Sequence, residues 1–164
     1  MMKKLLPVLL ICLMVLSACA AEAPKEATEP VGQMQIGNPW KSYESLTDAE
    51  TASGLTFPVP ETIPAGYVAE SYRVMSGSLL EATYRNGETE ITVRMKSGSN
   101  EDISGVYENF TKTETFHQND ASVICKQADD CLVYLVQKDS YCFSIYANSP
   151  TAEDACREIL TDIC

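Results

Sequence analysis

The chain has 164 residues, of which 45% are hydrophobic and 21% charged, with 12 Lys and Arg against 23 Asp and Glu. This length suits one globular domain with a tail, and the composition excludes collagen, a coiled coil and full disorder. The net charge of −11 makes nucleic acid a poor partner, because affinity for nucleic acid comes largely from Lys and Arg that neutralise phosphates.

The first segment predicts export. Two lysines precede an apolar run over residues 5–16, and small residues follow at Ser17 and Ala18, which is the pattern of a secretory signal peptide. The apolar run is shorter than the roughly 20 residues that a membrane-spanning helix needs. We therefore expect a cleaved signal rather than a permanent transmembrane anchor.

The end of this segment predicts a lipid anchor. Leu16-Ser17-Ala18-Cys19 resembles a bacterial lipobox, in which diacylglycerol is joined to the cysteine sulfur and the preceding peptide is removed. Residues 1–18 would then be a lipoprotein signal peptide, and Cys19 would hold the mature chain on the outer side of the cell membrane. The alternative is an ordinary thiol at Cys19 beside a conventional cleavage site, because Ala18 and Ala20 are also small.

A spacer and one folded domain are expected after the anchor. Residues 20–36 are rich in Ala, Glu, Pro and Thr and lack aromatic residues, so residues 19–37 are predicted to be the lipidated cysteine and a disordered spacer. Residues 38–164 are predicted to form a single domain. Removal of the signal peptide takes away two lysines and no acid, which leaves the mature chain more acidic and favours a domain that stands off an anionic lipid surface.

The domain is predicted to begin with a helix, an extended crossing and a set of strands. The stretch from Ser45 to Gly54 has a Ser cap, acidic first-turn residues and a final Gly, which favours a short helix. Three prolines over residues 58–64 favour an extended path. Asn86-Gly87 is a strong hairpin signal. The predicted strands are Tyr67–Met75, Leu79–Arg85, Thr89–Lys96, Ala121–Lys126, Leu132–Gln137 and Tyr141–Ala147.

Side-chain periodicity predicts the fold class. In the strand over residues 89–96, Ile91, Val93 and Met95 alternate with polar residues, the pattern of an antiparallel sheet with one face in water. From Thr151 to Ile163, apolar residues recur at helical spacing and can dock on such a sheet. We therefore predict an α+β fold: an antiparallel β-sheet meander covered by a C-terminal helix, with a short N-terminal helix.

Parts of this pattern resemble a known family. The run PW…SL…G…P…P.GY over residues 39–67 and SNEDISGVY over residues 99–107, with the hairpins and the final helix, are similar to domain-of-unknown-function family 4367 over residues 38–163. The family occurs in lipoproteins of Gram-positive anaerobes and outside the membrane in anti-sigma-like proteins. The resemblance implies an α+β fold and a place in the bacterial cell envelope, and it implies no activity, because none is assigned to the family.

The cysteines predict disulfides. Of the seven, Cys12 leaves with the signal peptide and Cys19 takes the lipid, so an odd number remains in the domain. An exported chain favours two disulfides and one free thiol. The alternative is that all are reduced and buried as small apolar groups in the envelope of an anaerobe. The remaining cysteines are Cys125, Cys131, Cys142, Cys156 and Cys164.

The positions of the cysteines along the chain limit which disulfide pairs can form. If residues 121–126 and 131–137 form a hairpin with Cys125 opposite Cys131, the Cα atoms of the two residues fall in disulfide range. Cys156 and Cys164 lie about 12 Å apart along a continuous helix, too far for a bridge. Cys142 is then expected to join Cys156, or Cys164 if the helix end frays. The unpaired thiol could also form a disulfide with a second copy of the chain, which would give a covalent dimer.

The sequence carries none of the common catalytic or metal motifs, since it lacks G-x-S-x-G, a P-loop, G-x-G-x-x-G and H-E-x-x-H. His117 is the single histidine and is expected on the plain surface rather than beside a catalytic thiol. The C-x5-C spacing is not a zinc pattern, and the pairs Glu101-Asp102 and Asp129-Asp130 lack the context of a calcium loop. We assign no catalytic residue, no metal ligand and no cofactor.

One string suggests a binding loop. In Ile103-Ser104-Gly105-Val106-Tyr107 the glycine permits close approach of a backbone and the tyrosine offers a stacking face. Ser104, Gly105 and Tyr107 are therefore candidate binding residues, although a turn that redirects the chain between strands is the favoured alternative. Trp40, the only tryptophan, is expected to be buried.

These patterns favour binding over catalysis. We expect a lipid-anchored extracytoplasmic domain without catalytic function that acts in protein interaction or envelope sensing, with an envelope protein as partner. The alternative is a lipoprotein that binds a small ligand, a peptide or a cation. Thermal melting distinguishes the ligand-binding alternative, because a ligand that binds only the folded state raises the melting temperature.

Overall fold

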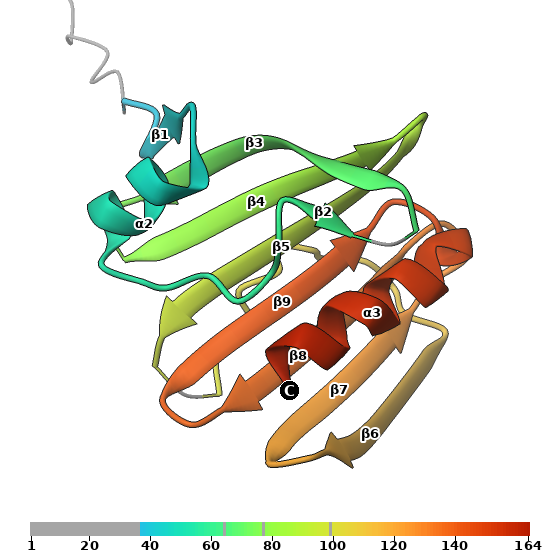
Figure 1. The fold of residues 1–164 in the computed structure, drawn as a ribbon. Helices are drawn as coiled ribbons and strands as arrows, with labels where there is room; N and C mark the ends of the chain where they lie inside the picture. The colour runs from blue at the N-terminus through green and yellow to red at the C-terminus, as the bar shows by residue number, and fades with distance from the viewer. Residues whose placement is uncertain (1–36, 64, 77, 99) are drawn as a thin grey trace, which may run out of the picture. The chain divides into compact units, whose positions relative to one another are not determined.

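An antiparallel sheet of nine strands forms the centre of the domain (Figure 1). The structure is a computed structural model, and it describes residues 37–63, 65–76, 78–98 and 100–164. The strand order is β1-β3-β4-β5-β9-β8-β7-β6, with β2 beside β3. The strands are β1 (Trp40–Tyr43), β2 (Thr62–Ile63), β3 (Tyr67–Met75), β4 (Leu79–Asn86), β5 (Thr89–Ser97), β6 (Lys112–Gln118), β7 (Ala121–Gln127), β8 (Leu132–Lys138) and β9 (Tyr141–Ala147).

In three hairpins, a two-residue turn connects the two strands. Between β4 and β5, β6 and β7, and β8 and β9, the first turn residue has a positive φ, at Gly87, Asn119 and Asp139. Gly, Asn and Asp adopt this conformation more readily than other residues, so the local sequence fixes where these strands reverse.

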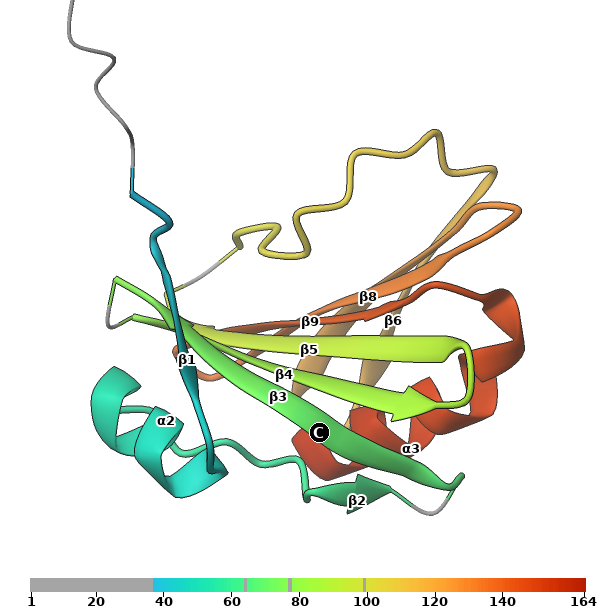
Figure 2. The same cartoon turned by 90° about the horizontal axis from the view of Figure 1, so that it is seen from above.

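The two α-helices of the described residues lie on the same side of the sheet (Figures 1 and 2). Helix α2 (Leu46–Ser53) begins at Ser45, whose hydroxyl accepts a hydrogen bond from the Asp48 N–H at 3.1 Å, and ends at Gly54 with φ of 69°. Helix α3 (Glu153–Ile163) follows the short 3-10 turn η1 (Pro150–Ala152) and packs on β9 and β2.

The hydrophobic core lies between the helices and the sheet. Every second residue of the central strands faces this layer, and α3 contributes its apolar stripe. Burial of each large apolar side chain contributes about 1.5–3 kcal/mol to folding. The largest apolar side chains of the core that are fully buried include Ile63, Leu80, Tyr84, Ile91, Tyr134, Ile145, Ile159, Leu160 and Ile163.

The predicted strands and both predicted helices are confirmed, and the fold is mostly antiparallel sheet with a short helix and a C-terminal helix. The sheet is more extensive than predicted, because β1, β2 and β6 were not expected. It also differs from a single meander. The strands β3-β4-β5 and β6-β7-β8-β9 form two successive meanders that join where β9 pairs with β5.

The predicted disulfides are wrong in this structure, because the cysteines of each predicted pair are not placed side by side. Cys125 lies opposite Tyr134 rather than opposite Cys131. Cys142 lies on the sheet face turned away from α3, so the sheet separates it from Cys156. Cys164 ends the chain after α3, where Lys138 donates to its carbonyl oxygen. All five cysteines of the described residues are free.

The anchor region lies outside the described residues. This concerns the predicted signal peptide (1–18), the lipidation site at Cys19 and the predicted spacer up to residue 36. Within residues 37–63, 65–76, 78–98 and 100–164, no helix has both the length and the apolarity needed to cross a membrane.

Candidate functional site

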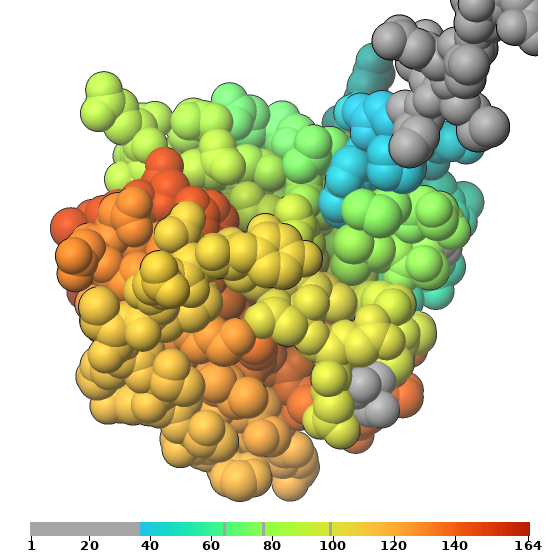
Figure 3. All heavy atoms as spheres, turned by 180° about the vertical axis from the view of Figure 1, so that it is seen from behind, coloured from blue at the N-terminus to red at the C-terminus, as the bar shows by residue number. Residues whose placement is uncertain are grey.

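The sheet face turned away from α2 and α3, here called the open face, carries polar side chains over its central strands. Residues 100–111, here called the crossing segment, run over this face between β5 and β6 (Figures 2 and 3). The strand register places the side chains of the open face in rows across the sheet. One row is Arg73, Glu81, Arg94 and Ser144, and the next is Thr83, Thr92 and Tyr146.

The first row is an ion-pair network around a buried carboxylate. Glu81 is 1% exposed, and its two oxygens are shared between two arginines. Nε of Arg73 donates to Oε1 at 2.7 Å, and Nε of Arg94 donates to Oε2 at 2.8 Å. A second N–H of Arg73, on Nη2, also donates to Oε1. The row therefore combines two positive charges with one negative charge in a fixed geometry.

Trp40 extends this network at the edge of the sheet. Its ring centroid lies 4.9 Å from the guanidinium carbon of Arg73 and 5.6 Å from that of Arg94. Such stacking is favourable because the face of an indole ring attracts cations. Trp40 is half-buried on the open face, so the expectation that it is buried is wrong: its β1 position pairs with Met75 and shares that residue's face.

Arg94 also holds the crossing segment against the sheet. Its Nη1 donates to the carbonyl oxygen of Ile103 at 3.0 Å and to that of Ser104. The segment turns at Gly105, which has φ of 68°, and a Cβ added there would lie 2.6 Å from Nη1 of Arg94. A glycine is therefore favoured by the conformation of this turn and by the close approach of the guanidinium.

Asp102 fixes the crossing segment at a second point. Its carboxylate accepts from Nζ of Lys126 at 2.8 Å and from the hydroxyl and the N–H of Ser104 at 2.6 and 3.0 Å. Burial raises the pKa of Asp102, but the hydrogen bonds from Lys126 and Ser104 outweigh burial and bring the pKa below its ordinary value. Lys96 pairs with Glu101 in addition.

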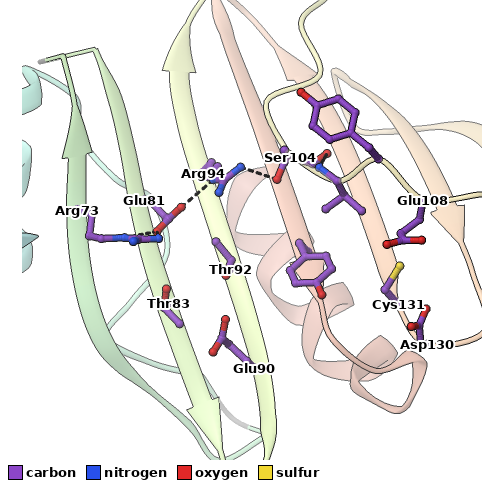
Figure 4. A pocket seen from close by; sticks show the side chains of 14 residues that line it. Arg73, Glu81, Thr83, Glu90, Thr92, Arg94, Ser104, Glu108, Asp130 and Cys131 are labelled. Atoms are coloured by element: carbon purple, nitrogen blue, oxygen red, sulfur yellow. Dashed lines mark hydrogen bonds and ion pairs between the residues drawn. The ribbon is translucent and has the colours of Figure 1, made fainter. Parts of the chain in front are cut away.

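A cavity of about 550 Å³ lies between the crossing segment and the open face (Figure 4). This volume falls in the range of small-molecule sites. One side holds the Arg73–Glu81–Arg94 network, and the buried hydroxyl residues Thr83 and Thr92, each 8% exposed, lie beside it. The lining residues are Arg73, Glu81, Thr83, Glu90, Thr92, Arg94, Ser104, Gly105, Val106, Tyr107, Glu108, Asp130, Cys131 and Tyr146.

The other side of the cavity is acidic. Burial raises the pKa of the Cys131 thiol, and the neighbouring Asp130 and Glu108 carboxylates raise it further. Burial likewise raises the pKa of the Tyr146 hydroxyl, with smaller contributions from Cys131, Glu90, Asp130 and Glu108. Negative charge therefore gathers at the end of the cavity opposite the arginines (Figure 4).

The candidate binding loop lies at this cavity. Ser104 and Gly105 line it, the carbonyl oxygen of Ser104 accepts from Arg94, and Tyr107 stands at its rim with 97% of the residue exposed. Sequence reasoning missed Glu81 and Arg94. The turn at Asn86-Gly87 fixes part of the register of the β4–β5 hairpin, and this register places Glu81 opposite Arg94. The hairpin signal is therefore the sequence feature from which this pair could have been predicted.

The other residues singled out from the sequence lie elsewhere. His117 is exposed on the edge strand β6. Cys142 lines a second cavity of about 280 Å³ beside residues 100–102 of the crossing segment, where its thiol donates to Gln137 at 3.3 Å. In the part of the chain that the structure describes, no group of three or more His, Cys, Asp or Glu residues is placed to hold a metal ion.

A scan against protein-family models finds no matching family, and searches of curated proteins and of solved structures find no match either. The resemblance to family 4367 thus stays an expectation from the sequence.

Proposed function

We propose that this chain is a lipid-anchored, extracytoplasmic binding domain whose open-face cavity takes a small ligand without chemical change. The observation that carries the proposal is the buried Arg73–Glu81–Arg94 network beneath the cavity of about 550 Å³. Its charges are already oriented by hydrogen bonds, so a ligand meets a site that needs little rearrangement.

The state of the charged groups supports binding over catalysis. Both oxygens of Glu81 accept hydrogen bonds from guanidinium groups, which suits a positioning group rather than one that transfers protons. Burial raises the pKa of Cys131, so this thiol stays protonated at neutral pH, whereas nucleophilic catalysis uses the thiolate.

A variant pair tests the ligand site. Thr92→Val removes a hydroxyl from the cavity at nearly constant shape, and Thr113→Val makes the same change on exposed β6, outside the lining. Native mass spectrometry of the mature protein from its producing cells is expected to show a bound small molecule. Thr92→Val should weaken its retention about three- to tenfold and Thr113→Val should leave it unchanged. A wild-type protein that always appears empty, with no rise in melting temperature for any added compound, contradicts the proposal.

A protein partner is the second candidate, and Tyr107 favours it. A fully exposed tyrosine at the rim of a cavity is the kind of residue that anchors protein interfaces. Crosslinking on intact cells, followed by purification through the anchored chain, is expected to give a stoichiometric protein partner that Tyr107→Ala loses. Recovery of the chain alone from both proteins argues against this candidate and leaves the ligand site standing.

A further inference from the structure

We infer that the cavity is built for a dipolar ligand, a short peptide with a free amino end and a free carboxyl end. This inference rests on the proposed ligand-binding function and specifies its ligand. It is carried by the separation of charge within one cavity, with guanidinium groups at one end and unpaired carboxylates at the other (Figure 4).

The guanidinium end suits a carboxylate. Glu81 neutralises one of the two arginine charges and leaves a net positive charge at this end of the cavity. A guanidinium has five N–H donors, and Arg73 uses those on Nε and Nη2 for Glu81. The Arg73 side chain is 39% exposed, so its other N–H groups can reach a ligand carboxylate, which Arg binds with two parallel hydrogen bonds.

The acidic end suits an ammonium group. Glu108 comes from the crossing segment and Asp130 from the turn between β7 and β8, and the two meet beside Cys131. Among the described residues, no ion pair involves Glu108 or Asp130. Glu90, the third acid of this end, is held by Arg85 at 2.7 Å. Two carboxylates are thus free to receive a ligand cation.

The spacing of the two ends fits a short peptide. The row of Arg73, Glu81 and Arg94 lies four positions along β5 from Glu90 at the acidic end, which is about 13 Å along an antiparallel strand. An extended peptide advances by at most about 3.3–3.6 Å per residue, so three residues span about 10–11 Å, which matches this separation to within the length of one residue. The hydroxyls of Thr83, Thr92 and Tyr146 lie in the row between the ends, where peptide N–H and C=O groups would pass.

The charges of the cavity and of the whole chain disfavour a ligand that carries a single charge. With a net charge of −11, the protein repels small anions at long range, although the arginines would accept them locally. A purely cationic ligand would leave the arginine end without a counter-charge. Only a ligand with both charges satisfies both ends of the cavity.

Isothermal titration with four trialanine peptides tests this inference on the mature full-length protein. The peptides are free trialanine, its N-acetyl form, its C-terminal amide and the form blocked at both ends. Free trialanine is expected to bind, and each single block should weaken binding tenfold or more. In a Glu108→Gln, Asp130→Asn variant, the N-acetyl block should cost no more than about twofold, because the variant has lost the carboxylates that the amino end contacts.

Control variants change the same charges away from the cavity. Arg157→Gln on α3 and Glu114→Gln on β6 should leave the binding of free trialanine within about twofold of wild type. Arg73→Gln should weaken the free peptide tenfold and the C-terminal amide hardly at all. Equal binding of the free and blocked peptides overturns the dipolar inference and leaves the ligand-binding proposal intact.

The two proposals fail differently. If none of the four peptides binds while the protein from its producing cells carries a small molecule that Thr92→Val loses, the dipolar inference alone is wrong. If no peptide binds and no such molecule is found, both proposals are wrong.

Discussion

Arg94 connects three parts of the site through a single side chain. Its Nε donates to the buried Glu81, its Nη1 donates to two carbonyl oxygens of the crossing segment, and its guanidinium stacks on Trp40. An arginine is suited to this role because its donors are fixed in one plane and its charge persists at all ordinary pH values. The conformation of the crossing segment therefore depends on residues that contact this guanidinium.

Gly105→Ala tests this dependence. Gly87→Ala is the matched control, because Gly87 has a similar φ of 61° and has no atom within 4 Å of an added Cβ, whereas Gly105 has Nη1 of Arg94 at 2.6 Å. The control should cost about 1 kcal/mol of unfolding free energy through its left-handed conformation. Gly105→Ala should cost at least about 1 kcal/mol more, because Arg94 must also move. Urea unfolding measures both, and equal costs would contradict the close approach.

Glu81→Gln tests the buried network. The substitution keeps the shape and removes the charge that compensates two guanidinium groups, so we expect a loss of about 2–3 kcal/mol in unfolding free energy. The loss should fall below the roughly 3–5 kcal/mol of fully buried pairs, because the Arg73 side chain is 39% exposed. The control, Glu114→Gln, breaks an exposed pair with Lys112 and should cost less than about 0.5 kcal/mol. A loss for Glu81→Gln as small as that of the control would contradict the structural role of Glu81.

Among the elements, the crossing segment depends most on electrostatics. Three cationic side chains of the sheet hold this segment. Arg94 donates hydrogen bonds to backbone carbonyl oxygens of the segment, and Lys96 and Lys126 form ion pairs with its Glu101 and Asp102. Few apolar residues of this segment are buried, so its position depends on charge rather than on packing. Acid should therefore loosen it before it unfolds the core.

The pH dependence of Asp102→Asn measures this effect. The pKa of Asp102 in the folded protein is below its ordinary value, so the carboxylate contributes stability above the unfolded pKa of about 4 and loses that contribution as the pH falls through the folded pKa. The variant keeps an oxygen that can accept from Ser104. Its deficit in unfolding free energy against wild type, measured in urea, should be present at pH 7 and shrink below pH 4. A deficit that stays constant down to pH 3 would contradict the role of the charge.

Local signals in the sequence identify the elements that carry strong patterns. Ser45 and Gly54 bound a helix by cap chemistry, and the alternation of Ile91, Val93 and Met95 identifies a half-buried strand. β6 was missed because its residues are polar and mostly exposed on both faces, and β1 and β2 are too short to show a period.

The site is harder to predict than the elements, because it depends on register. Glu81 meets Arg73 and Arg94 only through the pairing of three strands. The prediction of a disulfide between Cys125 and Cys131 was wrong for the same reason. The connection between β7 and β8 is longer than a two-residue turn, so no turn type fixed the register of these two strands.

The whole molecule is proposed to work at a membrane surface, with the acidic domain tethered through Cys19. Cys19→Ala removes the only sulfur that the lipobox resemblance assigns to the lipid, and the protein should move from the membrane fraction to the soluble fraction. Cys12→Ala, within the predicted signal peptide, is the control and should leave the protein on the membrane. Membrane association of the Cys19→Ala chain would show that an uncleaved helix holds it.

The most direct test of the central claim is to locate a bound ligand on the sheet. Chemical-shift mapping of the soluble Cys19→Ala protein, titrated with free trialanine, reports each backbone amide separately. Saturable shifts are expected at residues 104–108, at Thr83 and Thr92, and at Tyr146, around the cavity of the open face. Shifts confined to α3, to the β6 edge or to the second cavity would contradict the claim that this cavity is the binding site.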